Sequence, residues 1–198
     1  RQVAIAVLRA IHGDDGTAGE HAAAEFAALC GQVSAALERQ GGTLLFAAGS
    51  QLAFVVGYPD SHDHNAEQAA RLVLETMQQA GLRLGAAIGL GTARVLVDGA
   101  QTIVVGALVD EVVALAQDVR AGDVHLTAAA ASTLVRAFDI ELPSAGAEPS
   151  TPARLGLRRT PEALSARSRL VGRERSIAAL DAAWAAASRG HGRADHSE

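Results

Sequence analysis

The sequence contains no lysine, because all 17 of its permanently basic residues are arginine. This absence excludes mechanisms that depend on a lysine ammonium group, such as the phosphate-binding lysine of a P-loop or a Schiff base. The chain also has a single cysteine, Cys30, so no disulfide bond can form within it. Because Cys30 lies in a helical pattern of apolar residues, we expect a small buried side chain and not a reactive thiol.

Long apolar runs and an excess of basic charge are missing as well. No run approaches the roughly 20 residues that a membrane-spanning helix needs, and no signal-peptide pattern is present. A formal net charge of −5 gives no basic surface for nucleic acid or for a membrane. With 198 residues, of which 49% are hydrophobic, the sequence predicts a cytoplasmic globular domain with an appendage.

Apolar periodicity predicts strands and helices that alternate along residues 1–142. Residues 3–8 are nearly all apolar, as in a strand buried on both faces, and Gly41-Gly42 marks the end of the first helix. Hairpins between helices indicate an α+β or α/β fold, with an antiparallel-containing sheet flanked by helices. The predicted strands are residues 3–8, 43–48, 51–57, 82–90, 93–97, 101–105 and 123–126, and the predicted helices are residues 19–39, 63–80, 107–118 and 127–137.

The composition of the chain changes after residue 142. Residues 143–152 are rich in Pro, Ser, Ala and Gly, which is typical of a linker or a long loop. A second helical pattern follows at residues 169–188. The predicted organisation is a domain over residues 1–142, one further edge strand at 153–159, a linker over 143–168 and a second unit over 169–198.

Two short clusters of acidic and histidine residues offer metal-ligand chemistry. His62 and His64 flank Asp63, but this spacing lacks further ligands, which favours a solvated loop at the start of the next helix. Asp14 and Asp15 lie in a glycine-containing loop, where adjacent acids are usually solvated, although a metal pair stays open. No motif of a hydrolase, a metalloprotease or a P-loop protein is present.

Two Arg-x-x-Asp pairs, Arg120 with Asp123 and Arg136 with Asp139, offer a different chemistry. Such pairs clamp a guanine edge and a phosphate in cyclic dinucleotide receptors. The arginine and aspartate content of this chain makes their chance occurrence ordinary. The candidate ligand-binding residues are Arg9, Asp14, Arg120, Asp123, Arg136 and Asp139.

Several short motifs follow one another along the predicted strands and turns. They are Leu8-Arg9-Ala10-Ile11-His12-Gly13, Gly41-Gly42, Phe46-Ala47-Ala48-Gly49-Ser50, Val56-Gly57-Tyr58-Pro59, Asp63-His64-Asn65-Ala66, Val105-Gly106-Ala107-Leu108-Val109-Asp110 and Ala121-Gly122-Asp123-Val124. In order and spacing they resemble the motifs of the class III nucleotide cyclase homology domain, the catalytic module of adenylyl and guanylyl cyclases. The resemblance covers residues 3 to about 142 and implies an α+β fold with a ferredoxin-like βαββαβ core.

The metal-binding positions that this resemblance implies lack their acidic groups. In active cyclases two aspartates hold two divalent ions, which activate the ribose hydroxyl and neutralise the triphosphate. The resemblance places Ala10 and Ser50 at those positions, and neither a methyl nor a hydroxymethyl group replaces an anionic ligand. We therefore expect no metal, no cofactor and no cyclase activity of the usual mechanism.

The four remaining catalytic positions implied by the resemblance have changed too. Phe46 and Ile103 stand where a lysine and an aspartate select the purine, and Asp110 replaces the asparagine that orients the ribose. Ala114 stands at the position of the transition-state arginine. The residues Phe46, Ile103 and Leu108 also predict that apolar side chains fill the former cleft.

A second resemblance concerns Arg169-Leu170-Val171-Gly172-Arg173-Glu174-Arg175 and the alanine- and leucine-rich helix expected after it. The segment resembles the one that precedes the ATPase module of STAND-type, often LuxR-type, bacterial regulators. In those regulators a P-loop follows, and this chain contains none up to Glu198. The other interpretation is an ordinary surface helix after a linker.

The two resemblances together imply a catalytically inactive regulatory and dimerisation module of a bacterial signalling ATPase or transcriptional regulator. The expected partner is a second copy of the chain, the downstream ATPase, or both. Two alternatives stay open. One is a sensor that binds a nucleotide or cyclic dinucleotide in the former active cleft, and the other is a residual adenylate or guanylate cyclase.

Overall fold

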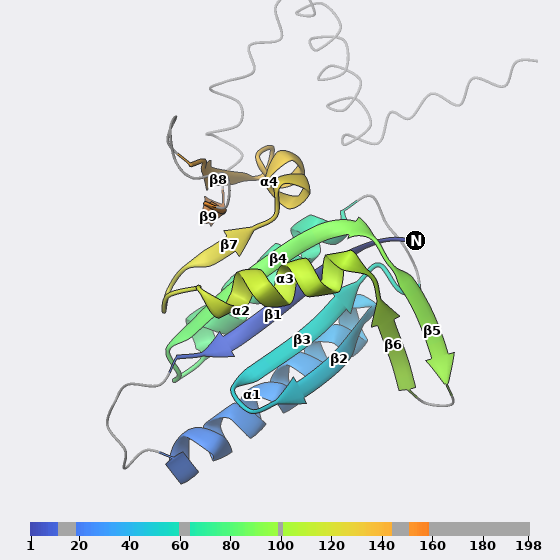
Figure 1. Ribbon diagram of the computed structural model, residues 1–198. Helices are drawn as coiled ribbons and strands as arrows, with labels where there is room; N and C mark the ends of the chain where they lie inside the picture. The colour runs from blue at the N-terminus through green and yellow to red at the C-terminus, as the bar shows by residue number, and fades with distance from the viewer. Residues whose placement is uncertain (12–18, 60–63, 99–100, 144–150, 159–198) are drawn as a thin grey trace, which may run out of the picture. The chain divides into compact units, whose positions relative to one another are not determined.

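The computed structural model describes residues 1–11, 19–59, 64–98, 101–143 and 151–158. These residues form a seven-stranded sheet, a separate two-stranded sheet and four α-helices (Figure 1). The strands of the large sheet are β1 (Gln2–Ala10), β2 (Gly42–Ala48), β3 (Gln51–Val56), β4 (Leu84–Thr92), β7 (Val124–Leu126), β8 (Phe138–Glu141) and β9 (Ala153–Arg158). Their order across the sheet is β2-β3-β1-β4-β7-β9-β8.

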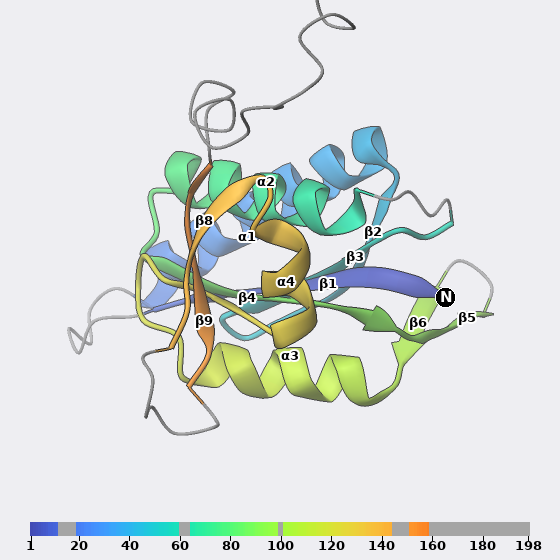
Figure 2. The same cartoon turned by 90° about the horizontal axis from the view of Figure 1, so that it is seen from above.

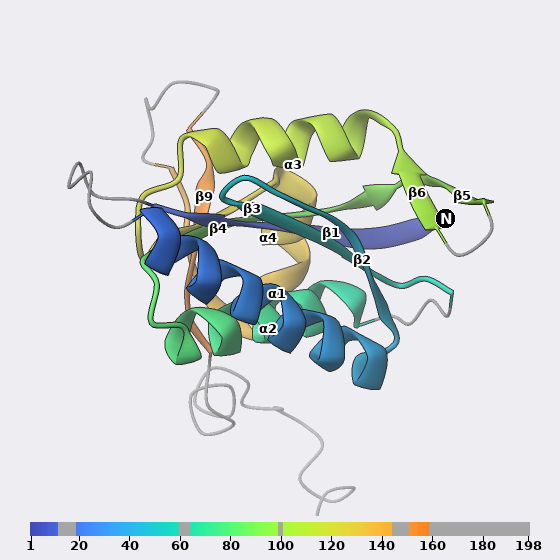
Figure 3. The ribbon, with the colours of Figure 1, turned by 90° about the horizontal axis from the view of Figure 1, so that it is seen from below.

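The helices and the small sheet complete the domain. The helices are α1 (Gly19–Gln40), α2 (Asn65–Gln79), α3 (Ala107–Gln117) and α4 (Ala128–Leu134), and the small sheet is a hairpin of β5 (Arg94–Asp98) and β6 (Gln101–Val105). Figures 2 and 3 show α1 and α2 on one face of the large sheet and α3 on the other. No helix in the described part of the chain is long and apolar enough to cross a membrane.

β1 lies inside the large sheet, and its sequence explains this position. It pairs antiparallel with β3 on one side and with β4 on the other, so that Ala6 lies opposite both Phe54 and Ile88. Successive side chains of a strand point to opposite faces, and Leu8 joins the core on the α1 side whereas Val7 joins the core on the α3 side. A strand covered on both faces needs a continuous apolar run, and the prediction for residues 3–8 is confirmed.

The turn between α1 and β2 depends on two glycines. Gly41 adopts a φ of +73°, a left-handed conformation that commonly ends a helix. At Gly42, the first residue of β2, a β-carbon would lie 2.5 Å from Cδ2 of Leu37. Glycine at this position avoids that contact. The predicted helix end at Gly41-Gly42 is confirmed.

The elements from β1 to β4 form the ferredoxin-like βαββαβ core that the sequence predicts. Four strands in the order β2-β3-β1-β4 are covered by α1 and α2, and all their pairings are antiparallel. β7 then extends the sheet by parallel pairing with β4. The α+β class is therefore confirmed.

The far end of the sheet differs from the prediction. β8 was not predicted, because its four residues are too few for a clear pattern, and α4 ends at Leu134 where a helix to residue 137 was expected. β9 is not an edge strand, since it lies between β7 and β8. This pairing joins segments that are distant in the chain, which local periodicity does not report. The predicted linker beyond residue 158 and the unit at 169–198 lie outside the described residues and stay predictions.

Candidate functional site

The structure brings the two positions of the implied metal ligands together. Ala10 ends β1, and Ser50 lies in the turn between β2 and β3, where Gly49 adopts a φ of +58°. The backbone N–H of Ala10 donates to the carbonyl oxygen of Ser50 at 2.8 Å. The Ala10 side chain is buried and that of Ser50 is half-buried. The two positions are therefore neighbours in the fold, and neither side chain carries a charge.

No metal cluster is present elsewhere in the described part of the chain. Among these residues no group of three or more His, Cys, Asp or Glu side chains is arranged to hold an ion. His64 is 78% exposed and lies just before α2, in agreement with a solvated helix start. Asp14, Asp15, His62 and Asp63 lie outside the described residues.

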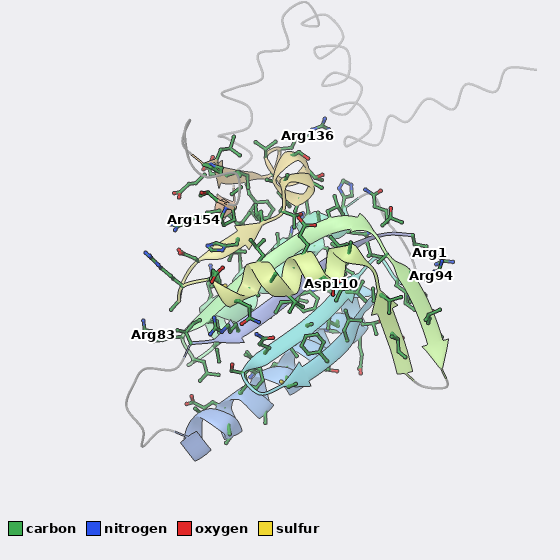
Figure 4. All side chains as sticks on the ribbon, viewed as in Figure 1. Arg1, Arg83, Arg94, Asp110, Arg136 and Arg154 are labelled. Atoms are coloured by element: carbon green, nitrogen blue, oxygen red, sulfur yellow. The ribbon has the colours of Figure 1, made fainter. Side chains whose placement is uncertain are left out.

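Two of the four other implied positions lie on α3. Asp110 is in its first turn (Figure 4) and Ala114 is one turn later, and both are exposed. The remaining two lie on β2 and β6, which contact one another. Phe46 is half-buried against the α3-side core, and Leu108 in that core is 7% exposed.

Ile103 does not fill the former cleft, and the prediction for this residue is wrong. It is 39% exposed, because β6 turns Val104 toward the core and Ile103 toward the opposite face. Its cross-strand partner is Leu96 of β5, which is 48% exposed. The hairpin of β5 and β6 projects beyond the large sheet (Figure 1), and its exposed large apolar residues are Leu96, Val97, Ile103 and Val105.

The candidate ligand-binding arginines differ in their surroundings. Arg9 has a hydrogen-bond partner within the fold, whereas Arg120 and Arg136 are exposed. Arg9 donates a hydrogen bond to the carbonyl of Gln117, the last residue of α3, where a cation is favourable to the helix dipole. The carboxylate of Asp123 lies 3.6 Å from the guanidinium of Arg154 on β9, a residue that the sequence did not single out. Arg120 is exposed in the turn before β7.

The second Arg-x-x-Asp pair lies at the start of β8. Arg136 is in the turn before this strand (Figure 4), Asp139 is its second residue, and both are exposed. The two pairs are thus separated by α4 along the chain and lie at the start of different strands. Cys30 is half-buried against the core, and burial raises the pKa of its thiol, in agreement with a packing role.

A groove that the sequence did not reveal lies between α3, α4 and the β7–β9 end of the sheet. Its volume of about 750 Å³ is in the range of small-molecule pockets. Ala114 lines it, together with the carboxylates of Glu111 and Asp118 and apolar side chains such as Leu115 and Val135. Among the described residues that line it, none has a basic side chain. These residues come from elements far apart in the chain, so no local motif marks the groove.

The chain resembles known proteins in structure but not in sequence. No protein-family model matches the chain, and no curated protein matches it significantly. The monomeric guanylyl cyclase domain of the RhoGC fusion protein from the aquatic fungus Blastocladiella emersonii has a TM-score of 0.67 at 15% identity, over 80% of this chain and 96% of that chain. A dimeric form of the same fungal domain has a TM-score of 0.64 at 18% identity, over 80% and 97%. The adenylyl cyclase CyaB from P. aeruginosa has a TM-score of 0.59 at 13% identity, over 81% and 95%.

This chain has the nucleotide cyclase fold. At these identities the likeness establishes the fold alone and says nothing of the activity. The order of the motifs found in the sequence agrees with it, because the strands and helices they predicted are those of the cyclase fold.

The cyclase fold of this chain also buries a histidine that sequence reasoning missed. His125 on β7 is 6% exposed, and neither ring nitrogen makes a hydrogen bond of good geometry within the described residues, although the backbone of Leu115 lies close enough to act to raise the pKa of the ring. Its register partner is Ala87, which packs on the α3 side, so the ring lies on that face of the sheet. Burial lowers the pKa of His125, and this effect outweighs the nearby carboxylates of Asp123 and Asp118.

The buried imidazole predicts a loss of stability in acid. Because the pKa of His125 is lowered in the folded state, the unfolded chain binds this proton first as the pH falls below about 6.5. The free energy of unfolding then decreases, by at most about 1.4 kcal/mol per pH unit for one proton. His125→Leu is expected to remove this part of the pH dependence, measured by urea unfolding between about pH 7 and 5. His64→Leu, which removes an exposed imidazole, is the control, and an unchanged slope in His125→Leu would contradict the assignment.

Proposed function

We propose that this chain is a catalytically inactive domain of the nucleotide cyclase fold, which acts as a dimerisation and regulatory module. The observation that supports it is the junction between β1 and the β2–β3 turn. There the backbones of Ala10 and Ser50 meet at 2.8 Å, but their side chains offer a methyl and a hydroxymethyl group. Two-metal catalysis needs anionic oxygen ligands at such a site, and these residues supply no charge.

The charges around α3 support the loss of nucleotide chemistry. Asp110 is exposed in the first turn of α3, and the groove that Ala114 lines carries Glu111 and Asp118. Like charges repel, so a triphosphate or a cyclic dinucleotide is disfavoured near this helix. The ion pair of Asp123 with Arg154 further weakens the cyclic dinucleotide alternative, since this carboxylate is already occupied.

The hairpin of β5 and β6 supports an interaction role. A two-stranded hairpin is marginally stable alone, and this one exposes large apolar side chains on both of its faces. Exposed apolar surface of this kind marks protein contacts, and we assign it to a second copy of the chain. Both a monomeric and a dimeric form of the fungal guanylyl cyclase domain have been solved, so the fold is compatible with either state.

The identity of the partner to be regulated is proposed from the sequence. Residues 169–175 resemble the segment before the ATPase module of STAND-type regulators, often of the LuxR type. A bacterial cyclase-fold module beside such an ATPase would control it through its own dimerisation. This step rests on the resemblance and on the exposed hairpin.

Restoring both acidic positions tests the proposal. Ala10→Asp/Ser50→Asp is expected to bind Mn²⁺ with a Kd of about 1 mM or below, whereas the natural chain shows no binding in isothermal titration calorimetry. Ala10→Asn/Ser50→Asn has side chains of the same size without the charge and is expected not to bind. Mn²⁺ binding by the natural chain as tight as that of the aspartate variant would contradict the proposal.

A further inference from the structure

The groove beside α3 has the features of a binding site that the proposed function does not use. Its floor and walls are mainly apolar, with side chains such as Leu126, Ala131 and Pro152. A volume of about 750 Å³ accommodates a small organic molecule. The exposed Leu142, which is 70% exposed, extends the apolar surface at its edge. The groove therefore offers a ligand an apolar surface to pack against.

The charge on the groove has one sign. Glu111 lies on α3, and Asp118, the residue that follows the last turn of α3, comes two turns later, about 10 Å along the helix axis and on the same side. Among the described residues, neither carboxylate has an ion-pair partner and no arginine lines the groove. Next to Asp118, His125 is buried with a lowered pKa and adds no positive charge at neutral pH.

From this combination we infer that the groove binds a small amphiphilic organic cation, with an apolar body against the walls and an ammonium or guanidinium group at Glu111 or Asp118. Burial of the apolar body supplies the affinity. The carboxylates give the groove a preference for cationic ligands, because they attract positive charge and repel negative charge. The inference does not depend on the hairpin contact or on the loss of charge at Ala10 and Ser50, since none of these residues lines the groove, although Ala114, the position implied for the transition-state arginine, does.

A series of three probes with the same alkyl chain separates the two contributions. Octyltrimethylammonium, 1-octanol and octanoate differ in charge, and their binding to the full chain is measured by titration calorimetry below micelle-forming concentrations. We expect octyltrimethylammonium to bind about tenfold more tightly than octanol, and octanoate to bind more weakly than either. Absence of binding by octyltrimethylammonium, or equal binding of octanoate, would overturn the inference.

Variants locate the site. Glu111→Gln/Asp118→Asn is expected to remove the tenfold preference and to leave octanol binding unchanged. The matched control is Asp110→Asn with Glu38→Gln, which removes two exposed carboxylates that do not line the groove, one of them on the same helix, and should keep the preference. Loss of the preference in the control, or its survival in the groove variant, contradicts the assignment.

A filling substitution tests the apolar part. Ala114→Trp places a large side chain in the groove from an exposed helix position, so binding of all three probes should fall at least about tenfold. Ala128→Trp, from α4, is a second filling variant whose result stands if the first variant fails to fold. Unchanged binding in either folded variant would show that the probes bind elsewhere and would overturn the inference.

Discussion

Replacing Phe138 by alanine is expected to lower the free energy of unfolding by about 3–5 kcal/mol. Phe138 begins β8 and is fully buried in the core on the α1 and α2 side of the sheet. Truncation removes most of its buried apolar surface and leaves a cavity, since the neighbouring strand β9 and helix α4 are held by their own pairings. Urea unfolding followed by circular dichroism measures the change.

The control for this substitution lies a few residues away. Leu142 is 70% exposed, and Leu142→Ala should change the stability by no more than about 0.5 kcal/mol. A loss below about 1 kcal/mol for Phe138→Ala would mean that β8 does not pack as described, and with it the position of β9 inside the sheet would be wrong.

The double substitution Leu96→Ser/Ile103→Ser is expected to dissociate the proposed dimer. The two side chains form a cross-strand pair on one face of the hairpin and are 48% and 39% exposed. In a two-fold symmetric dimer four apolar side chains would be lost from the interface, and because each is already about half buried in one copy, each contributes about 0.7 kcal/mol or more. The dissociation constant should rise by at least about 100-fold, measured by sedimentation equilibrium.

A matched variant tests whether the effect belongs to the hairpin. Val135→Ser/Leu142→Ser removes two apolar side chains of comparable exposure, 40% and 70%, from another part of the surface. It should leave the dimer unchanged. A natural chain that stays monomeric at high concentration, or equal dissociation in both double variants, would contradict the hairpin contact.

The inner part of the fold was predictable from local sequence patterns. The apolar run at residues 3–8 required a strand covered on both faces, and Gly41 and Gly42 marked the turn after α1. The meeting of Ala10 and Ser50 followed from the motif order, because a strand end and a hairpin turn have fixed places in the cyclase fold.

The outer part required long-range information. β9 lies between β7 and β8 through pairings such as Leu126 with Ala153 and Ile140 with Leu155, which no local period encodes. The exposure of Ile103 depends on which face of the β5–β6 hairpin meets the core. The sequence of β6 is apolar at most positions, so it does not show which face that is. The groove and the burial of His125 arise only when α3 packs over β7.

The most direct test of the central claim is a turnover assay on the intact chain. ATP and GTP are each supplied with Mg²⁺ or Mn²⁺, and cyclic AMP and cyclic GMP are measured by chromatography and mass spectrometry. Because Ala10 and Ser50, which the resemblance places at the two metal-ligand positions, carry no charge, we predict no cyclic nucleotide above the level found without protein. Cyclic product that increases in proportion to protein concentration and depends on the metal would contradict the claim that this cyclase fold is inactive.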